Sequence, residues 1–348
     1  MSYTIIIIFL DLMIPVSAAA MEQGAYRRSY EYLVKLQILD EIESWSMSRT
    51  MGDLNKLFRN WKTRQSYSQY SISNLEPVLK VRRALLDISL SRVRDAKAKT
   101  HLERQLGNCW LMSAKVARKA GQLNKAYNLL LEAENRRNKD VFIERAKLAW
   151  ARSNPNDAII TLENGIRDQY PELAKITNKD QVINSFDKED LNTCGQGKLL
   201  LAKYVDEAAT LGPNAVAGCY NEAKVLLRQN EDVHYYSARF FDKSIGKNYE
   251  ASDLDAKGDI IAHIITQYCR SLTFGCEHLH QSLARLLSLW LDYGSRVYLA
   301  REAKKSYKKK ILDDMLKAFH KMNEIIEKFI RSSPSYYFLS VFPQLTSR

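Results

Sequence analysis

Three residues near the middle of the chain have the types that a phosphate-binding loop uses. Gly195, Gly197 and Lys198 lie within Gly195-Gln-Gly197-Lys198. The motif also needs a glycine five residues before the second glycine and a Ser or Thr after the lysine. Asn192 and Leu199 occupy those two positions. We therefore interpret this stretch as a turn before a helix, and we expect no nucleotide-binding residues in the chain.

A second group combines the side chains that zinc prefers. Cys269, Cys276 and His280 would fall on one face of a helix, with His278 close by. The closely spaced ligand pairs of a structural zinc site are missing, so we interpret these as core and interface residues and expect no metal site. The five cysteines are odd in number and lack a CxxC pair, which indicates reduced thiols inside the cell rather than a disulfide framework.

The densest basic run of the chain could neutralise phosphates. It is Arg301-Glu-Ala-Lys-Lys-Ser-Tyr-Lys-Lys-Lys310, and its candidate contact residues are Lys304, Lys305, Lys308, Lys309 and Lys310. Such blocks usually mark solvated linkers, and no aromatic stacking motif accompanies this one. Arg82, Arg83 and Arg92 are scattered in the same way. The net charge of +12 permits nucleic acid or acidic protein surfaces as partners without requiring either, so direct nucleic-acid binding remains a third alternative that we do not expect.

No set of catalytic motifs is present in the sequence. A protein kinase would need a glycine-rich loop, a strand lysine, a His-Arg-Asp loop and Asp-Phe-Gly, and none of these occurs. The serine-hydrolase elbow, the metalloprotease helix and the calcium loop are absent as well. We therefore assign no catalytic residue, no cofactor and no enzymatic activity to this chain.

The elements that would position any site form a helical repeat. Trp110, Ala114, Gly121, Ala126 and Leu130 follow the tetratricopeptide order of large, small, turn glycine, small and large residues. Small residues recur in this pattern because two antiparallel helices approach closely. The spacing predicts a helical pair at about 108–134.

A second pair is predicted at about 141–168. Ala146 and Trp150 lie in its first helix, residues 153–157 form its turn, and Ala158 opens its second helix. Ala158 follows Ala126 by 32 residues, which is close to the tetratricopeptide period of about 34. Two successive registers favour an all-α fold, an α-solenoid of tetratricopeptide/HEAT-like helical hairpins.

The remaining chain is also predicted to be helical. One helix is expected over 18–46, a loop over 63–74, and a helix over 76–91 with Ser73 or Asn74 as its cap. A polar insertion is expected over 170–190, then further helical pairs over 198–348, including helices near 259–273, 277–301 and 306–331. The apolar run 4–10 has no basic residue before it, is interrupted early by Asp11 and is too short to span a bilayer, so we expect neither a secretory signal nor a membrane contact. Residues 1–16 are not expected to form part of the folded domain.

Several stretches together resemble the FAT region of phosphatidylinositol 3-kinase-related kinases, and within that family its ATR-like branch. The most specific run from Cys109 to Gly121 and from Ile143 to Trp150. Others are Ser17–Tyr26, Tyr236–Lys243, Arg270–Gly275, Leu287–Gly294 and Gln344–Arg348, all in the family's order. The resemblance covers about residue 12 to the end, whereas residues 1–16 match poorly. It implies one FAT-type domain over 17–348.

This resemblance implies a scaffold around a kinase domain that is absent from this sequence. The parent protein would be a non-specific serine/threonine kinase using ATP and Mg, acting in the nucleus in the DNA-damage and replication checkpoint. The implied partners are that kinase domain, an ATRIP-like regulatory subunit and a second protomer. The chain is then expected to be a fragment of a longer protein. The alternative is a stand-alone tetratricopeptide adaptor that binds a peptide or helix.

Overall fold

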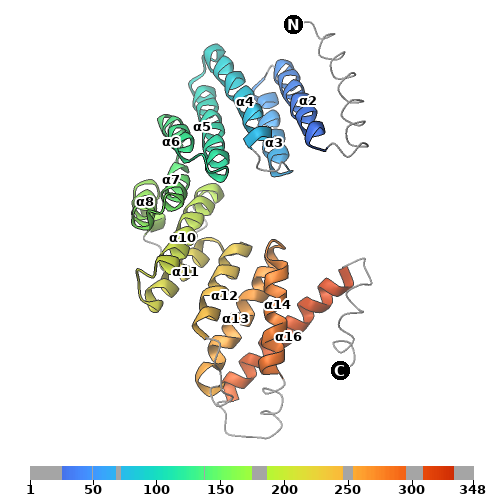
Figure 1. The fold of residues 1–348 in the computed structure, drawn as a ribbon, viewed down its shortest axis with the longest axis vertical. Helices are drawn as coiled ribbons and strands as arrows, with labels where there is room; N and C mark the ends of the chain where they lie inside the picture. The colour runs from blue at the N-terminus through green and yellow to red at the C-terminus, as the bar shows by residue number, and fades with distance from the viewer. Residues whose placement is uncertain are drawn as a thin grey trace. The chain divides into compact units, whose positions relative to one another are not determined.

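The computed structural model of the chain describes residues 26–48, 50–67, 72–136, 138–174, 186–245, 254–294 and 309–332. Every regular element in these ranges is a helix, as Figure 1 shows. The chain divides into two compact units, Met1–Gly165 and Ile166–Arg348. The described helices form the all-α helical-repeat solenoid that the sequence predicts.

The first unit consists of helices joined by short connections, which makes neighbours along the chain antiparallel. They are α2 (Tyr26–Met47), α3 (Met51–Tyr67), α4 (Ile72–Arg92), α5 (Ala96–Lys119), α6 (Leu123–Asn135), α7 (Val141–Ala151) and α8 (Pro155–Gln169), the last of which crosses the boundary between the units. Local chemistry sets several starts. Asp95 accepts a hydrogen bond from the Ala98 amide at 2.9 Å and caps α5.

Helix α3 begins with a reciprocal cap. The Asp53 amide donates to Thr50 Oγ1 at 3.2 Å, while the Asp53 carboxylate accepts from the Thr50 amide at 3.0 Å. The apolar side of α3 then packs with α4 and α5 in one core cluster, through Leu54, Leu57, Phe58 and Trp61. Packing of these large side chains determines where α3 lies.

The prediction of a loop over 63–74 is wrong for most of that segment. Helix α3 continues to Tyr67, and α4 already begins at Ile72, so Ser73 and Asn74 lie inside α4 instead of capping it. The physical reason is burial: Leu75, Val78 and Leu79 are almost fully excluded from solvent, and this packing outweighs the polar composition of the segment.

The second unit is built around α13 (Leu254–Phe274), which packs against α12 (Glu231–Ile245), α14 (Leu279–Leu289) and α16 (Lys309–Ser332). Its other elements are α9 (Pro171–Ala174), α10 (Lys188–Ala208), α11 (Pro213–Leu226) and a π-helical turn, η3 (Trp290–Gly294). The core includes Ile264, Ile265, Leu286, Leu289 and Phe319. Pro213 stands at the first turn of α11, where its missing amide hydrogen costs nothing.

The predicted insertion at 170–190 is only partly tested. Helix α9 and the first residues of α10 fall inside it, whereas 175–185 lie outside the described residues. Segment 1–16 and Lys304, Lys305 and Lys308 lie outside them too, and only the backbone of Lys309 and Lys310 is described. Over the described part of the chain, no helix has the length and apolarity that a bilayer crossing requires.

Candidate functional site

The glycine-lysine stretch lies inside a helix, which corrects its interpretation as a turn. Gly195 and Gly197 are buried in α10, which begins at Lys188, ten residues before the predicted start at Lys198. A Cβ at Gly195 would lie 2.6 Å from Leu227 Cγ, so the residue permits close packing with the segment after α11. Lys198 Nζ donates to the Ala174 carbonyl at 3.4 Å and to Glu222 at 3.1 Å. These residues therefore join α9, α10 and α11.

The cysteine and histidine candidates for a zinc site lie in different environments. Cys269 is buried, whereas Cys276 and His280 are exposed. His278 stacks on Tyr235 at 3.9 Å between ring centroids, and its Nε2 lies 2.9 Å from Asp232 Oδ1. Within the described ranges, no three His, Cys, Asp or Glu side chains form a group that could hold a metal ion.

The first predicted repeat pair corresponds to α5 and α6. Ala114, Ala126 and Leu130 are buried between these helices and α7. Gly121 has φ +77° in the turn. Its amide bonds the Arg118 carbonyl, and the next amide, of Gln122, bonds the Ala117 carbonyl. This is the Schellman arrangement, in which a left-handed residue closes a helix, so the glycine is required by backbone conformation.

The second pair, α7 and α8, repeats the same geometry. Shifting by 32 residues places Gly121 on Ser153, which also has positive φ at 62°. The Asn154 amide donates to the Ala149 carbonyl, which corresponds to the bond from the Gln122 amide to the Ala117 carbonyl in the first turn. The same shift places Ala114 and Ala126 on Ala146 and Ala158, and all four are buried to 0% exposure. The structure therefore carries the repeat period in backbone conformation as well as in residue type.

The large residues of the repeat do not all lie where the tetratricopeptide analogy suggests. The residue 32 positions after Trp110 is Phe142, which is buried, whereas Trp150 is half-buried near the end of α7. A Cβ on Gly165 would overlap the Phe142 side chain, so α7 and α8 approach at this point because Gly165 lacks one. Trp110 is also half-buried and packs against two core clusters of the first unit.

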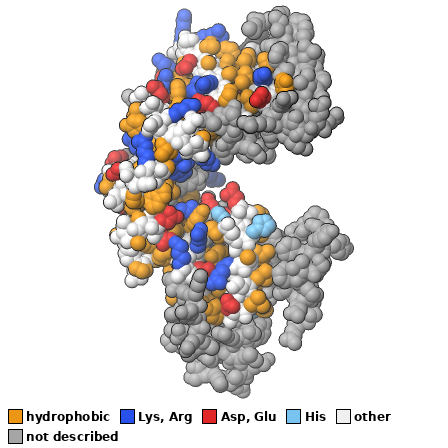
Figure 2. Space-filling view, viewed as in Figure 1, with side chains coloured by type: hydrophobic (Ala, Val, Ile, Leu, Met, Phe, Trp, Pro, Cys, Tyr) orange, Lys and Arg blue, Asp and Glu red, His pale blue; other side chains and the backbone are white. Residues whose placement is uncertain are grey.

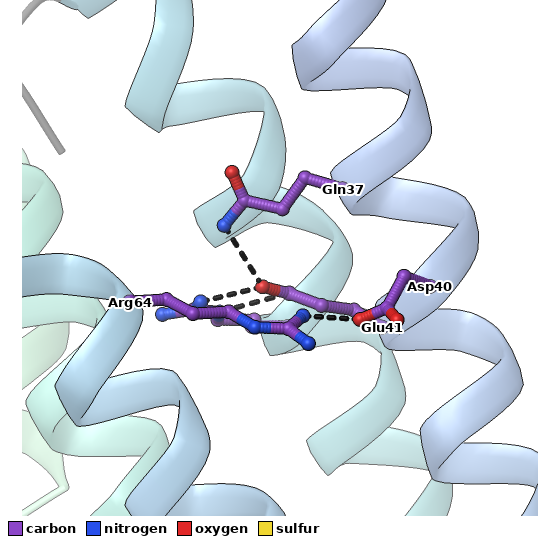
Figure 3. Close-up of polar contacts among 5 residues, drawn as sticks. Gln37, Asp40, Glu41 and Arg64 are labelled. Atoms are coloured by element: carbon purple, nitrogen blue, oxygen red, sulfur yellow. Dashed lines mark hydrogen bonds and ion pairs between the residues drawn. The ribbon is translucent and has the colours of Figure 1, made fainter. Parts of the chain in front are cut away.

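A buried ion-pair cluster lies beside these repeats, and the sequence patterns do not predict it. Arg82 of α4 donates to both carboxylate oxygens of Glu41 of α2, at 2.9 and 2.5 Å, and Gln37 donates to the same carboxylate at 3.2 Å (Figure 3). Glu41 is 0% and Arg82 2% exposed. The Arg82 guanidinium lies 4.9 Å from the Trp61 ring centroid. The exposed pair of Asp40 and Arg64 lies at the edge of the cluster.

A parallel arrangement links α4 to α5. Arg83 donates to Glu76 at 3.1 Å and to the Ser113 hydroxyl, while its guanidinium lies 4.2 Å from the Trp110 ring centroid. The prediction that Arg82 and Arg83 are scattered, solvated charges is wrong, because both side chains are buried and paired. Their partners lie 41 and 7 residues away along the chain, so no local pattern reveals the first of these pairs.

Polar contacts also hold the second unit together. The Glu231 carboxylate accepts from the Glu277 amide at 3.0 Å and from the His278 amide at 2.7 Å, just before α14. Asp242 accepts from Arg285 at 2.7 and 2.8 Å. Carboxylates at a helix start satisfy free amides and the helix dipole. The Glu231 and Asp242 carboxylates thus link α12 to the start of α14 and to α14 itself.

Comparison with known proteins identifies the family. Residues 10–288 match the model of the FAT domain. This chain belongs to the FAT family. It is 28% identical to serine/threonine-protein kinase ATR of Drosophila melanogaster over 95% of its length, and 26% identical to that of Arabidopsis thaliana over 97%. It is 27% identical to protein kinase rad3 of Schizosaccharomyces pombe over 70% of its length and 10% of that kinase.

The FAT chain covers a small part of these relatives. It spans 13% of both the Drosophila and the Arabidopsis kinase. The resemblance to the FAT region of ATR-type kinases is confirmed by the family match and these relatives, and the all-α solenoid is confirmed as well. Together these findings describe a helical scaffold related to one segment of ATR-type serine/threonine kinases.

Proposed function

We propose that this FAT chain supports and regulates the kinase domain of an ATR-like serine/threonine kinase. The observation that carries the proposal is the similarity to ATR-type kinases along 95–97% of the chain, in a region that the FAT model also matches. Stacked helical hairpins with ion pairs between their helices present surfaces that can position a catalytic domain and transmit partner binding to it. The domain proposed for this role is 17–348, with the pairs at 108–134 and 141–168 inside it.

The parent protein in this proposal acts in the nucleus in the DNA-damage and replication checkpoint. ATP and Mg would be used by its kinase domain. An ATRIP-like regulatory subunit and a second protomer would be its partners. In this proposal the kinase domain of the parent protein carries out the phosphate transfer, and the FAT chain supplies no catalytic residue. Purified 1–348 should therefore show no phosphotransferase activity. ATP turnover that persists after removal of contaminating kinases would contradict this part of the proposal.

A chimera tests the scaffold role directly. The segment of the Drosophila kinase that corresponds to 17–348 is replaced by this chain, and kinase activity is measured after purification. We expect activity to be retained, and cells that depend on the chimera to survive replication stress. A matched chimera carrying Glu41→Leu tests whether the buried Glu41–Arg82 ion pair is needed. It should have lower kinase activity and be purified in lower yield. A well-folded chimera without kinase activity would contradict the proposal.

The adaptor alternative predicts a different outcome. Large apolar side chains such as Leu291, Met47 and Ile160 are 76%, 58% and 53% exposed. If a missing domain covers surfaces of this kind, isolated 1–348 should self-associate. A monodisperse monomer, together with an inactive but folded chimera, would favour a stand-alone peptide-binding adaptor instead.

A further inference from the structure

The outer face of α3 carries three positive charges. Lys56, Arg59 and Lys62 are exposed and follow one another at intervals of three residues. A rise of about 1.5 Å per residue spreads them over about 9 Å of the helix. On the face of the molecule that Figure 2 shows, basic and acidic side chains are interspersed, so a helix face with charges of one sign departs from that pattern.

Helix α5 adds a fourth cation beside this face. The rings of Phe58 on α3 and His101 on α5 lie 5.8 Å apart between centroids, so the two helices meet here. Lys97 is exposed and precedes His101 by one helical turn, and Lys62 follows Phe58 by one turn. Both charges therefore lie within about 6 Å of this contact along the helix axes. We define the α3–α5 basic surface as Lys56, Arg59, Lys62 and Lys97.

The charges of this surface have no partner within the described part of the chain. Their four side chains take part in no hydrogen bond, ion pair or ring contact there. The carboxylates nearest to them in sequence are those of Asp53 and Asp95, and each accepts a hydrogen bond from a backbone amide at a helix start, at 3.0 and 2.9 Å. Arg64, which pairs with Asp40, is two residues from Lys62 and so lies on another side of α3. The cations are therefore available to an anionic ligand.

The side chains around the cations favour nucleic acid over protein as that ligand. Asn55, Asn60 and Thr63 fill most of the rest of the exposed side of α3, and no large apolar side chain described on α3 or α5 is exposed. Protein interfaces have an apolar centre and are depleted in lysine. Interfaces with nucleic acid are polar and positively charged, and amide and hydroxyl side chains in them also bind phosphate oxygens. The composition of this surface therefore matches a phosphate backbone.

The lack of exposed aromatic side chains distinguishes duplex from single strand. Proteins that bind single strands stack the bases on aromatic side chains. The aromatic residues nearest to the cations on α3, Phe58 and Trp61, are 8% and 5% exposed and belong to the core. Binding of a duplex without reading of bases needs only cations that contact phosphates. The α3–α5 basic surface meets the second requirement and not the first.

We propose that the α3–α5 basic surface binds the phosphate backbone of double-stranded nucleic acid, independently of its sequence. We did not expect direct nucleic-acid binding from the sequence, in which Lys62 and Lys97 are 35 positions apart, but the fold brings them to one surface. The basic run at 301–310 takes no part in this site. The proposal does not rest on the kinase-scaffold function, because it concerns a surface of the first unit and can fail while the chimera remains active.

The test measures binding of a fluorescent duplex of about twenty base pairs to the full 1–348 chain by anisotropy, at several salt concentrations. A single-stranded oligonucleotide of equal charge and a peptide of glutamates are the comparison ligands. They separate duplex binding from single-strand binding and from attraction to any acidic partner.

Three variants accompany the unmodified chain. Lys56→Gln/Arg59→Gln/Lys62→Gln removes the charges on α3, and Lys97→Gln removes the one on α5. A control variant removes the same charge as the α3 triple variant from exposed lysines of α6, α10 and α16, as Lys125→Gln/Lys188→Gln/Lys321→Gln. All the replaced side chains are exposed, so thermal unfolding should be unchanged.

We expect the α3 triple variant to weaken duplex binding by about tenfold or more at low salt. It should also reduce the slope of log affinity against log salt by about 2–3, because each phosphate contact contributes about 0.9 to that slope. Lys97→Gln should reduce the slope by about 1, and the control triple variant should change affinity by less than about twofold.

Four results would overturn the proposal. They are no duplex binding by the unmodified chain, duplex binding that does not weaken as salt rises, equal losses in the two triple variants, and tighter binding of the single strand or the acidic peptide than of the duplex. The first, second and fourth are measured on the unmodified chain, so they do not depend on how any variant folds.

Discussion

Glu41 and Arg82 form a two-point ion pair with hydrogen bonds of 2.5 and 2.9 Å, although the residues are 41 positions apart. Neither side chain is more than 2% exposed. A buried charge of this kind is stable only while its partner is present. The pair therefore makes the packing of α2 on α4 dependent on both residues.

Removing one partner should destabilise the first unit strongly. Glu41→Leu or Arg82→Met should each lower the free energy of unfolding by about 3–5 kcal/mol, because a buried charge is left uncompensated. The double variant should lose much less than the sum. Urea unfolding followed by tryptophan fluorescence is suitable, since Trp45, Trp61, Trp110 and Trp150 all belong to this unit.

The exposed neighbour of this pair supplies the control. Asp40 and Arg64 are 45% and 40% exposed, so Asp40→Asn should cost no more than about 1 kcal/mol. If the two single variants at Glu41 and Arg82 were simply additive in the double variant, the buried pair would not be coupled.

Two glycines of the repeats should respond differently to substitution. Gly121→Ala should cost about 1–2 kcal/mol because φ is positive there, and Gly121→Asn should cost less, since asparagine tolerates that conformation. Gly165→Ala should cost about 1–3 kcal/mol through overlap with Phe142, and Gly165→Asn should be worse. Thermal unfolding of the four variants separates backbone strain from steric overlap. If the asparagine and alanine variants ranked in the same order of stability at both glycines, this distinction would be contradicted.

Acidification should weaken the second unit through His263. Burial, with added repulsion from Lys224 and Arg270, lowers the pKa of this histidine from 6.5 to about 4. Between these values the unfolded state binds more protons than the folded state, so the free energy of unfolding falls as pH decreases from about 6.5 to about 4. The loss should be at most roughly 3 kcal/mol.

The variant His263→Phe isolates this contribution. His263 packs edge-on against Phe241 with ring centroids 5.0 Å apart, so an aromatic replacement suits its surroundings. Urea midpoints measured between pH 7 and pH 4.5 should show a smaller decline for this variant than for the parent chain. His234, whose pKa burial also lowers, remains as a second source of the same trend. Parallel curves for variant and parent would show that His263 does not contribute.

The cysteines should divide into reactive and protected groups. Burial raises the pKa of Cys109 and Cys194 to about 11 and that of Cys269 to about 12, and thiols kept protonated and buried react slowly. Cys276 is exposed and should be alkylated first. Mass spectrometry after brief treatment with iodoacetamide, with and without urea, checks the order. Rapid labelling of Cys269 in the folded chain would contradict the packing around α13.

The repeat illustrates what could be read from the chain. Ala114, Ala126 and Gly121 have residue types that only close helix packing and a left-handed turn explain, so the hairpins follow from local pattern. The interpretation of the stretch at Gly195 as a turn was wrong, since this segment lies inside α10, where Gly195 packs closely against Leu227 at the end of α11. Helix α3 was not predicted, although Leu54, Leu57, Phe58 and Trp61 have the spacing of an amphipathic helix; only the structure shows that they pack with α4 and α5.

By itself, the sequence determined the helical class, the 32-residue period and the family, because these depend on residue types at fixed spacings along one chain. The tertiary structure alone decided that Arg82 and Arg83 are buried and paired, and that Arg118 of α5 pairs with the buried Glu144 of α7. Charge interactions depend on distance through space and on exclusion of water, and neither is encoded in sequence separation.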